Sequence, residues 1–584
     1  MVTGVLLALS TWGLALVLIV LVGLVFGTLG SEDRLGALRR SAWWGFAIAT
    51  ALILAMSLAT PLGTPTNVLA LAVAALLSAA AGARSFRRLS WSLRRPRVGE
   101  LLVVVALLGS MSYLALAALG PVTNYDSGLY HLGALRYQQE VGLVPGIANL
   151  YFPLGYSNSV IPWSAFLGST PWGANGFRLF NGLLFVMLAA ETMIRILQRR
   201  TSPGTYLLLG GLFFVWIPMV ALSDYWVTSP TSDSSVLILT TVAVAYLADA
   251  VYQGRQSREV WANLGVAVAL GWVLVSMRPT MAIFALAVFA IAIIVTVRNR
   301  ANASLRRNGT LGALTAATLS LGVVLGLLQA LRDRVLSGWL QYPLSVFAFD
   351  VPWLAPNPTE ARTATLGAAR DPGNLWLAAD SWGWIPGWIT RLPSQWEFWL
   401  VVLLALASTA LAYVASRSDR GFTARFVALA ATPSAIAVLA WFLASPPAFR
   451  FIWGPLFTLV ALPGAFAAST LASRSQSARP EIRQGLITAT AVPLVLVTAF
   501  SATTRFDFPE ITSPQTFVAG PLSVPYLVAP LPRPGVTDRV LPSGLTVLIP
   551  EESDQCWDVY PLCTAQLLDS VALVGEEWED GFRH

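Results

Sequence analysis

Long apolar runs recur along the chain, and each is long enough to cross, as a helix, a hydrocarbon layer about 30 Å thick. Hydrophobic residues make up 56% of the 584 residues and charged residues only 11%, too few to cover the surface of a water-soluble protein. Hydropathy therefore predicts an all-α polytopic transmembrane helix bundle with about 14 spans. We expect these spans near residues 4–27, 43–60, 66–83, 100–120, 175–197, 205–222, 232–252, 260–277, 281–297, 309–329, 397–415, 424–443, 452–473 and 485–503.

The positions of the basic residues predict which way the spans run. All 37 basic residues are arginine, and those in the short loops fall on one side of the predicted spans. Because an excess of basic residues marks cytoplasmic loops, both termini are expected outside the cytoplasm. The net charge of +7 is thus a topology signal, and the expected partner is a lipid bilayer rather than a nucleic acid. The first span has no basic residue before it, unlike a secretory signal peptide, so we expect it to be retained.

Long polar segments divide the chain into six expected parts. Two long extracytoplasmic loops and a C-terminal tail interrupt or follow the helices, and short interfacial helices are expected within the loops. The parts are N-terminal transmembrane helices at 1–120, a first long loop at 121–174, transmembrane helices at 175–329, a second long loop at 330–396, transmembrane helices at 397–503 and the tail at 504–584.

The first long loop opens on a motif, NYDSGLYH at residues 124–131, that concentrates reactive side chains. Asp126 lies five residues before His131, one of only two histidines in the chain, and Tyr125 and Tyr130 lie beside them. The apolar spacing that follows predicts a short helix, at whose first turn Asp126 could act merely as a cap. The nearby imidazole of His131 favours a reaction centre at a membrane surface over a simple helix cap. Asp126 and His131 are therefore the candidate catalytic residues.

The segment after this motif, at 144–159, is rich in glycine, proline and asparagine and cannot continue as a helix. Irregular backbone at membrane depth is tolerated only where it is buried in protein or lines a watery cavity. We therefore expect this segment to form the wall of a cavity.

Other polar residues occupy the expected outer edge of the membrane. Arginine is the favoured bidentate partner of phosphate, so the outer arginines are candidates to bind one. Each candidate has a structural alternative: an arginine can snorkel at a helix end, and an aspartate can cap a helix. The tryptophans of the second long loop could stack on sugars or form an interfacial belt. The further substrate-binding candidates are Tyr125, Tyr130, Arg136, Asn149, Asn158, Asp224, Asp233, Arg278, Asp350 and Arg450.

The two cysteines, Cys556 and Cys563, both lie in the tail. Their close spacing and the oxidising exterior predict a disulfide, which would contribute about 2–3 kcal/mol by closing a short loop. Two free buried thiols are the alternative. A metal site is disfavoured because two thiols without a nearby histidine supply too few ligands.

Several sequence blocks together resemble an uncharacterised family of bacterial polytopic membrane proteins, from about residue 100 to the C-terminus. The blocks are NYDSGLYHLGALRY followed by VPGIANLYFPLGYSNS, then SGWLQYP with FDVPW, SPPAFRFIWG, and DQCWDVYPLCT with a closing GFR. The overall plan, many spans with an acidic residue in the first long outer loop, resembles the GT-C fold glycosyltransferases. This resemblance implies a location in the bacterial cytoplasmic (inner) membrane.

The GT-C resemblance also implies a reaction. In that class the loop carboxylate is catalytic and the sugar donor is a polyprenyl-phosphate lipid, so by position the role of general base falls on Asp126. The acceptor would be a glycan or lipid of the cell envelope. His131 would share the proton or, when protonated, hold the donor phosphate, while Arg278 and Arg450 would neutralise the leaving phosphate. The chain has one carboxylate where many GT-C enzymes have an adjacent pair, which puts a metal-dependent mechanism in doubt. No cofactor is therefore expected with certainty, and a divalent cation stays open.

Two other classes of protein fit the composition. A transporter or flippase of envelope precursors also has many spans, but coupling places ionisable groups deep in the bilayer. Here Glu191 and Asp249 lie toward the expected cytoplasmic ends, and the polar residues gather outside. A glycan polymerase or a scaffold subunit is the third alternative, and a scaffold would not need Asp126 beside His131. Glycosyl transfer therefore ranks first.

Overall fold

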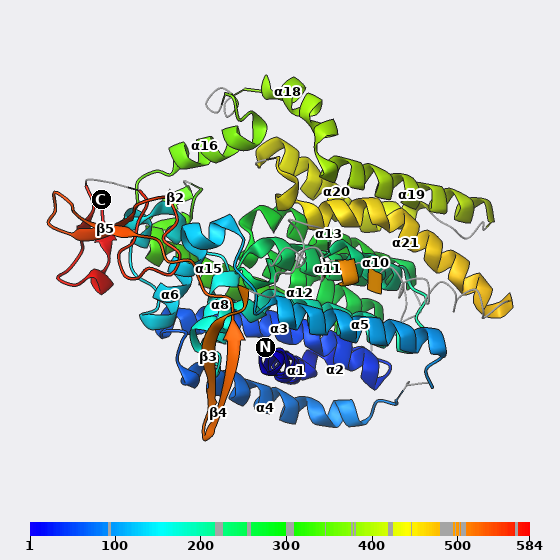
Figure 1. Ribbon diagram of the computed structural model, residues 1–584. Helices are drawn as coiled ribbons and strands as arrows, with labels where there is room; N and C mark the ends of the chain where they lie inside the picture. Colours follow the sequence, from blue (N-terminus) through cyan, green and yellow to red (C-terminus); the bar gives the residue numbers. More distant parts are fainter. Residues whose placement is uncertain are drawn as a thin grey trace.

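A computed structural model describes residues 1–584 apart from 92–94, 217–225, 254–258, 300–308, 345, 375–377, 379–380, 419–423, 446, 479–494, 497, 501–502, 504–509 and 567–569. The described chain is mostly helical, and the strands form small two-stranded sheets. Figure 1 shows the helices packed into a bundle, with the strands of the tail gathered near one end of it.

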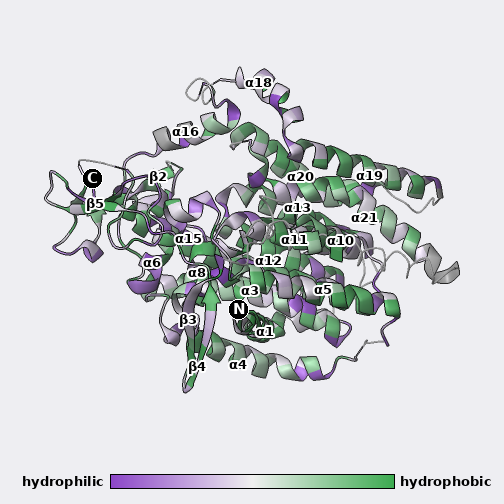
Figure 2. Cartoon of the chain, viewed as in Figure 1, coloured by the Kyte–Doolittle hydropathy of each residue, from purple (hydrophilic) through white to green (hydrophobic). Residues whose placement is uncertain are grey.

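Twelve helices among the described residues are long and apolar enough to cross a membrane, so the structure supports the expected multi-pass membrane protein. Figure 2 shows α19 and α20 mainly in the hydrophobic colour. The spanning helices are α1 (Val2–Val22), α3 (Arg34–Ala59), α4 (Pro65–Arg87), α5 (Val98–Ala117), α9 (Phe180–Leu197, preceded by η3, Gly173–Leu179), α11 (Ser232–Gln253), α12 (Glu259–Met277), α13 (Ala282–Asn299, preceded by η7, Pro279–Met281), α15 (Thr310–Ser337), α19 (Trp396–Ser418), α20 (Ala424–Ala444) and α21 (Trp453–Ala478).

Two of the expected spans are not among these twelve. The one near 205–222 begins as the shorter helix α10 (Pro203–Phe214), and its second part lies largely outside the described residues. The one near 485–503 lies mostly outside them as well.

Short elements connect the spans. The other α-helices are α2 (Leu24–Thr28), α6 (Leu132–Glu140), α7 (Ile147–Leu150), α8 (Val160–Leu167), α16 (Thr359–Arg370) and α18 (Trp384–Arg391). Single turns are η1 (Ser127–His131), η2 (Phe152–Gly155), η5 (Trp226–Thr228), η8 (Leu392–Ser394), η9 (Phe449–Phe451) and η11 (Trp578–Asp580). The strands pair in sequence order as antiparallel hairpins: β1 (Trp339–Gln341) with β2 (Val346–Ala348), β3 (Ser513–Ala519) with β4 (Leu522–Val528), β5 (Val536–Val540) with β6 (Thr546–Pro550), and β7 (Ala572–Leu573) with β8 (Phe582–Arg583).

Helix α11 lies at the centre of the bundle, because every residue from Asp233 to Val251 is buried. It packs against α10, α12, α20 and α21. The outer helices instead expose large apolar side chains, among them Leu14 of α1, Leu77 of α4 and Leu403 of α19. Exposed leucines on the outside of a helix bundle are what contact with lipid requires.

Arginine-bearing segments meet at one end of the bundle, which we call the arginine end. Arg39 of α3 pairs with Glu191 of α9 at 2.7 Å, and Arg195 of α9 pairs with both Glu191 and Asp249 of α11 at 2.5 Å. These four side chains are at most 2% exposed. Buried charges are tolerated only when they are paired and hydrogen-bonded, and Tyr246 adds a hydrogen bond to Glu191 at 3.0 Å. The pairs therefore tie α3, α9 and α11 together.

The opposite end, which we call the loop end, carries η1, α6, α7, α8 and the tail. The segment expected to form a short helix after Asp126 folds as η1 followed by α6. The tail docks on this loop through backbone hydrogen bonds, from Ala529 N to Leu119 O at 2.7 Å and from Phe582 N to Pro145 O at 2.9 Å. The first long loop and the C-terminal tail thus form one folded layer.

We predict that Glu191→Gln destabilises the bundle, because it leaves the buried Arg39 with only a neutral partner and takes from Arg195 one of its two carboxylate partners. Breaking a buried pair costs about 3–5 kcal/mol, so the midpoint of thermal unfolding in detergent, followed by tryptophan fluorescence, should fall clearly. Glu140→Gln is the control, because its pair with Arg136 is 51% and 30% exposed, and an exposed pair contributes at most about 1 kcal/mol. Equal midpoints for the two variants would contradict the structural role of the buried pairs.

Candidate functional site

Two carboxylate–arginine pairs lie close together at the loop end. Asp126, just before η1, pairs with Arg450 of η9, with 3.3 Å between Oδ2 and Nη1. Asp233, in the first turn of α11, pairs with Arg278, which follows α12. Both guanidinium groups lie over the ring of Phe451, at 4.8 Å for Arg450 and 5.5 Å for Arg278. The ring of Phe451 thus brings Arg278 and Arg450, which are far apart in sequence, close together.

Serine and asparagine hydrogen bonds hold the motif against the start of α11. The hydroxyl of Ser127 in η1 bonds the hydroxyl of Ser229 at 2.6 Å, and Asn181 of α9 donates to the carbonyl of Ser229 at 2.8 Å. All three side chains are buried. These bonds fix η1 to the turn that precedes α11, which places Asp126 and Asp233 at the same end of the bundle.

His131 lies at the end of η1, buried to 3% exposure. Burial lowers the pKa of His131 to about 3; the carboxylate of Asp233 opposes this shift and the guanidinium of Arg450 adds to it. The ring is therefore neutral at pH 7. Of the two roles expected for His131, holding a phosphate as an imidazolium is disfavoured, because its buried site does not support the charge. We call Asp126, His131, Asp233, Arg278 and Arg450 the acid–arginine cluster.

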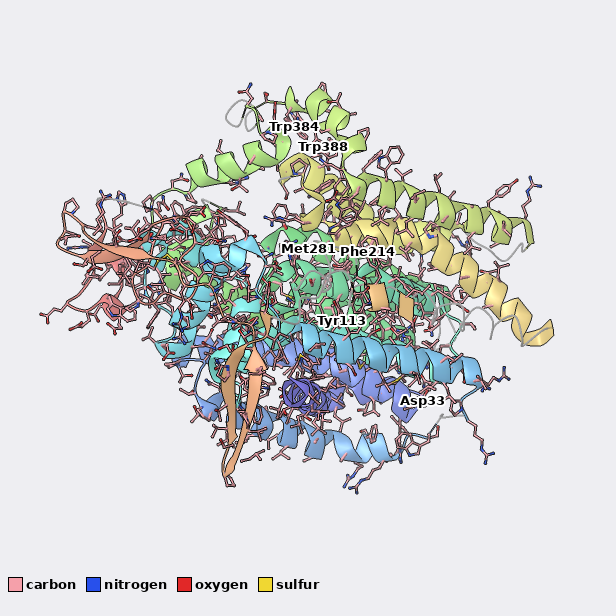
Figure 3. The ribbon with its side chains drawn as sticks, in the orientation of Figure 1. Asp33, Tyr113, Phe214, Met281, Trp384 and Trp388 are labelled. Carbon is pink, nitrogen blue, oxygen red and sulfur yellow. A yellow bond between two sulfur atoms is a disulfide. The ribbon has the colours of Figure 1, made fainter. Side chains whose placement is uncertain are left out.

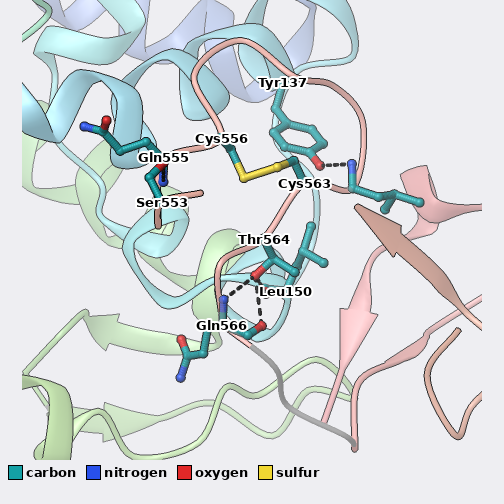
Figure 4. Close-up of a disulfide and its surroundings, with 9 residues drawn as sticks. Tyr137, Leu150, Ser553, Gln555, Cys556, Cys563, Thr564 and Gln566 are labelled. Atoms are coloured by element: carbon teal, nitrogen blue, oxygen red, sulfur yellow. Dashed lines mark hydrogen bonds between the residues drawn. A yellow bond between two sulfur atoms is a disulfide. The ribbon is translucent and has the colours of Figure 1, made fainter. Parts of the chain in front are cut away.

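A disulfide-closed segment of the tail covers the motif. The predicted bond between Cys556 and Cys563 is confirmed, with an S–S distance of 2.06 Å. Figure 4 shows this bond beside two anchors to the first loop: Leu562 N donates to the hydroxyl of Tyr137 at 3.0 Å, and Thr564 donates to Leu150 O at 2.9 Å. The segment is thereby fixed to both α6 and α7.

Residues just before and within this segment reach the motif itself. Trp557 N donates to Gly128 O at 2.8 Å, and a Cβ at Gly128 would lie 2.7 Å from the Trp557 ring, so only glycine fits this contact without a shift. Gln555 donates to Tyr125 O at 2.8 Å, and the hydroxyl of Tyr125 donates to Asp554. The hydrogen bond to Asp554 raises the pKa of Tyr125 to about 12. Tyr125 is therefore engaged with the tail.

A cavity of about 570 Å³ lies beside Arg278. Its walls are largely apolar and come from the start of α13, from α20 and from the loop after β1; Met281, one of the lining residues, is labelled in Figure 3. Arg362 of α16 also lines it, and Figure 1 shows α16 running from the β1–β2 hairpin toward α18 and α20. In the described part of the chain, Arg362 has no carboxylate within 4 Å. The cavity thus combines apolar walls with two guanidinium groups, and that of Arg362 has no ionic partner among the residues described.

Two sequence candidates besides Arg278 lie at this cavity or beside it. Asn158 lines the cavity, and its side-chain oxygen accepts hydrogen bonds from Val160 N at 3.0 Å and Ile161 N at 3.2 Å at the start of α8. Tyr130 stacks edge-on to His131 with 4.3 Å between ring centroids, and to Tyr156 of the cavity wall with 5.7 Å. Tyr130 therefore connects the motif to the cavity wall.

The remaining candidates lie elsewhere. The amide nitrogen of Asn149 is bonded to two backbone carbonyls, of Trp353 at 3.1 Å and Phe582 at 2.9 Å, which gives it a structural role between the loops and the tail. Arg136 pairs with Glu140 on the surface of α6, and Asp350 is exposed after β2. Asp224 lies outside the described residues.

Sequence reasoning missed Arg362. The available signal was its position in the second long loop, on the expected outer side, although that loop also holds Arg332, Arg334, Arg370 and Arg391. No group of three or more His, Cys, Asp or Glu side chains placed to hold a metal ion occurs among the residues that the structure describes.

The fold and this site define a multi-pass membrane protein with a polar site at one end of its bundle. The chain belongs to a family described as a domain of unknown function (DUF8201), whose model matches residues 5–457. That range contains the whole acid–arginine cluster and Arg362, and the disulfide-closed segment lies after it. No curated protein and no solved structure matches the chain.

We predict that burial of His131 makes the protein sensitive to acid. Above about pH 6.5 the ring is neutral in both the folded and the unfolded chain. Below that pH the unfolded chain takes up a proton that the folded protein cannot bind until about pH 3, so the free energy of unfolding falls as the pH falls, by up to about 1.4 kcal/mol per unit. The thermal midpoint of His131→Gln should therefore decline less than that of the wild type between about pH 7.5 and 5.

The other histidine provides the control. His584 is exposed, and its ring makes a hydrogen bond of 2.7 Å to the hydroxyl of Ser570, so His584→Gln should keep the wild-type slope. If His131→Gln also kept that slope, the buried neutral imidazole would be refuted.

Proposed function

We propose that this protein is a GT-C-like integral-membrane glycosyltransferase, which transfers a sugar from a polyprenyl-phosphate donor to a glycan or lipid acceptor of the cell envelope. The observation that carries the proposal is the cavity beside Arg278, which joins apolar walls to guanidinium groups next to the acid–arginine cluster. A polyprenyl phosphate has the matching chemistry, because its chain is apolar and its head group is an anion.

The cavity suits the two parts of such a donor differently. Ala437, Ala440 and Ala444 of α20 face it, and small side chains leave room for an isoprenoid chain beside the helix. Arg278 is already paired with Asp233. Arg362 has no carboxylate partner among the described residues, so it can pair with a phosphate. Arginine binds phosphate bidentately and stabilises the negative charge that develops on a leaving phosphate.

In the proposed reaction, Asp126 acts as the general base. The acceptor hydroxyl attacks the anomeric carbon, a new carbon–oxygen bond forms, and the proton of the hydroxyl passes to the Asp126 carboxylate. The bond between the anomeric carbon and the phosphate oxygen breaks, and the lipid phosphate leaves with the electron pair. Asp126 suits this role better than His131, because the Asp126 side chain is 25% exposed and His131 only 3%. Arg450 then orients the carboxylate.

We further propose that the loop end faces away from the cytoplasm of a bacterial inner membrane. The support is the collection of arginine-bearing segments at the other end, where Arg39, Arg195 and Arg200 lie. An excess of arginine marks the cytoplasmic side of a membrane protein. Outside the cytoplasm, nucleotide sugars are not supplied, so a transferase there needs a sugar donor carried by a lipid.

A flippase of lipid-linked precursors would use a similar cavity. A transported head group, however, needs polar groups along its path through the bilayer. The central helix α11 carries charge only at Asp233, in its first turn, and at Asp249, near its other end. The absence of charge between them on this helix favours a fixed site at one end.

We predict that Asp126→Asn abolishes sugar transfer. Purified protein in lipid nanodiscs would receive polyprenyl-phosphate hexose or pentose together with cell-envelope glycan, and mass spectrometry would follow release of polyprenyl phosphate. Loss of a general base should lower the rate by at least about 100-fold. Asp538→Asn is the matched control, because Asp538 is an exposed aspartate of β5 outside the cluster, and it should keep wild-type activity. A flippase would instead move the lipid across liposomes without consuming the donor, and an active Asp126→Asn variant would remove Asp126 from catalysis.

We predict that Arg362→Gln weakens binding of polyprenyl phosphate itself, measured by native mass spectrometry from nanodiscs. Loss of a hydrogen-bonded charge should reduce the affinity about 10-fold. Arg391→Gln is the control, since Arg391 lies on α18, outside the cavity lining, and stands 3.8 Å from Asp371. Equal affinities for Arg362→Gln and the control would exclude Arg362 from the phosphate site.

A further inference from the structure

A second cavity, of about 390 Å³, lies between the first long loop and the tail. Residues of α6 and η3 form one side of it, and residues of β3, β4 and the chain after β4 form the other. It shares no lining residue with the cavity beside Arg278, and no member of the acid–arginine cluster lines it. Its volume falls in the range of about 300–1,000 Å³ that is usual for small-molecule sites.

The charged residues of this second cavity are unbalanced. Its lining includes Arg136, Arg178 and Arg533 but only one carboxylate, that of Asp558. Within the described chain none of the three guanidinium groups lies within 4 Å of Asp558. The lining therefore has a net positive charge.

Arg178 contributes a buried charge to the cavity. It is 1% exposed, and its guanidinium donates to two backbone carbonyls, of Gly120 at 2.5 Å and Ala529 at 2.8 Å, and to the side-chain oxygen of Asn175 at 3.3 Å. No carboxylate of the described residues pairs with it. Burying a cation with neutral partners alone is costly, and an anion in the adjoining cavity would offset that cost.

The other two arginines are accessible to a ligand. Among the residues that the structure describes, Arg136 pairs only with Glu140, which lies outside the lining, and its buried Nε has no hydrogen-bond partner. Arg533 is exposed and makes no ion pair with any described residue. Both groups can therefore donate to an anion without first breaking an ion pair across the cavity.

Neutral hydrogen-bonding groups complete the lining. Asn175 donates to Gln515 at 3.3 Å, and Gln515 donates to Ser513 at 3.2 Å. These are long bonds, which the hydroxyl groups of a ligand can replace at little cost. Leu132 and Leu135 of α6 supply apolar surface beside them. Such a mixture of amide, hydroxyl and apolar contacts is suited to a sugar ring.

We propose that this second cavity binds an anionic saccharide, whose carboxylate or phosphate group contacts Arg136 and Arg533 and is attracted by the buried charge of Arg178. The site is separate from the cavity beside Arg278, so the inference holds whether or not the protein transfers sugars. It assigns a binding function to the surface where the tail meets the first loop.

The test is titration calorimetry on the full-length protein in nanodiscs. The probes are digalacturonate, which carries carboxylates, maltose 1-phosphate, which carries a phosphate, neutral maltose, and inorganic phosphate. We expect at least one of the two anionic saccharides to bind about 10-fold more tightly than maltose and than inorganic phosphate. The saccharide that binds more tightly shows whether the site recognises a carboxylate or a phosphate group.

Variants locate the binding. Arg533→Gln should weaken binding of the anionic saccharide by several-fold, and Arg136→Gln with Arg533→Gln should abolish the preference over maltose. Arg583→Gln, an exposed arginine of β8 outside the lining, should bind as the wild type does. Equal binding of charged and neutral saccharides, equal binding of inorganic phosphate, no binding of any probe, or wild-type binding by the double variant would each overturn the proposal. Because Arg533 is exposed, an unchanged thermal midpoint for Arg533→Gln would show that lost binding is not lost folding.

Discussion

The bilayer interior cannot solvate charge, and this constraint decides where the polar groups of the chain lie. The central helix α11 shows its effect at both ends: Asp249 pairs with Arg195 at the arginine end, and Asp233 pairs with Arg278 at the loop end. Between these two pairs the helix is apolar or weakly polar and fully buried. The pairs therefore do two things at once, since they neutralise buried charge and fix neighbouring helices to the centre of the bundle. The pair with Asp233 also holds Arg278 at the edge of the cavity of about 570 Å³.

The loop end meets a different constraint, because its irregular backbone must find hydrogen bonds without forming a helix. The tail supplies many of them. Phe582 N donates to Pro145 O, its carbonyl accepts from Asn149, and Thr564 reaches Leu150 O. The amide nitrogen of Asn149 illustrates how a polar side chain in such a loop serves the backbone. The acid–arginine cluster is then held by a loop whose conformation is set from several hundred residues away.

Hydropathy predicted the helical bundle well, because an apolar run of about 20 residues has one main use in a membrane. Local spacing also predicted the short helix after Asp126 and the disulfide between Cys556 and Cys563. The pairing of Asp126 with Arg450 was beyond sequence reasoning, since nothing in either segment names its partner across more than 300 residues. Arg362 was missed for a similar reason, because only the fold places it at a cavity lined by residues of α13 and α20. The burial of His131 was also beyond sequence reasoning, and of its two expected roles it disfavours the one that needs a charged ring.

The contact between Gly128 and Trp557 carries a consequence for biogenesis. The motif emerges from the ribosome more than 400 residues before the tryptophan that packs on it, so its final shape has to wait for nearly the whole chain to be synthesised. The motif therefore stays incompletely packed during translation, until the tail has been made and has docked on it.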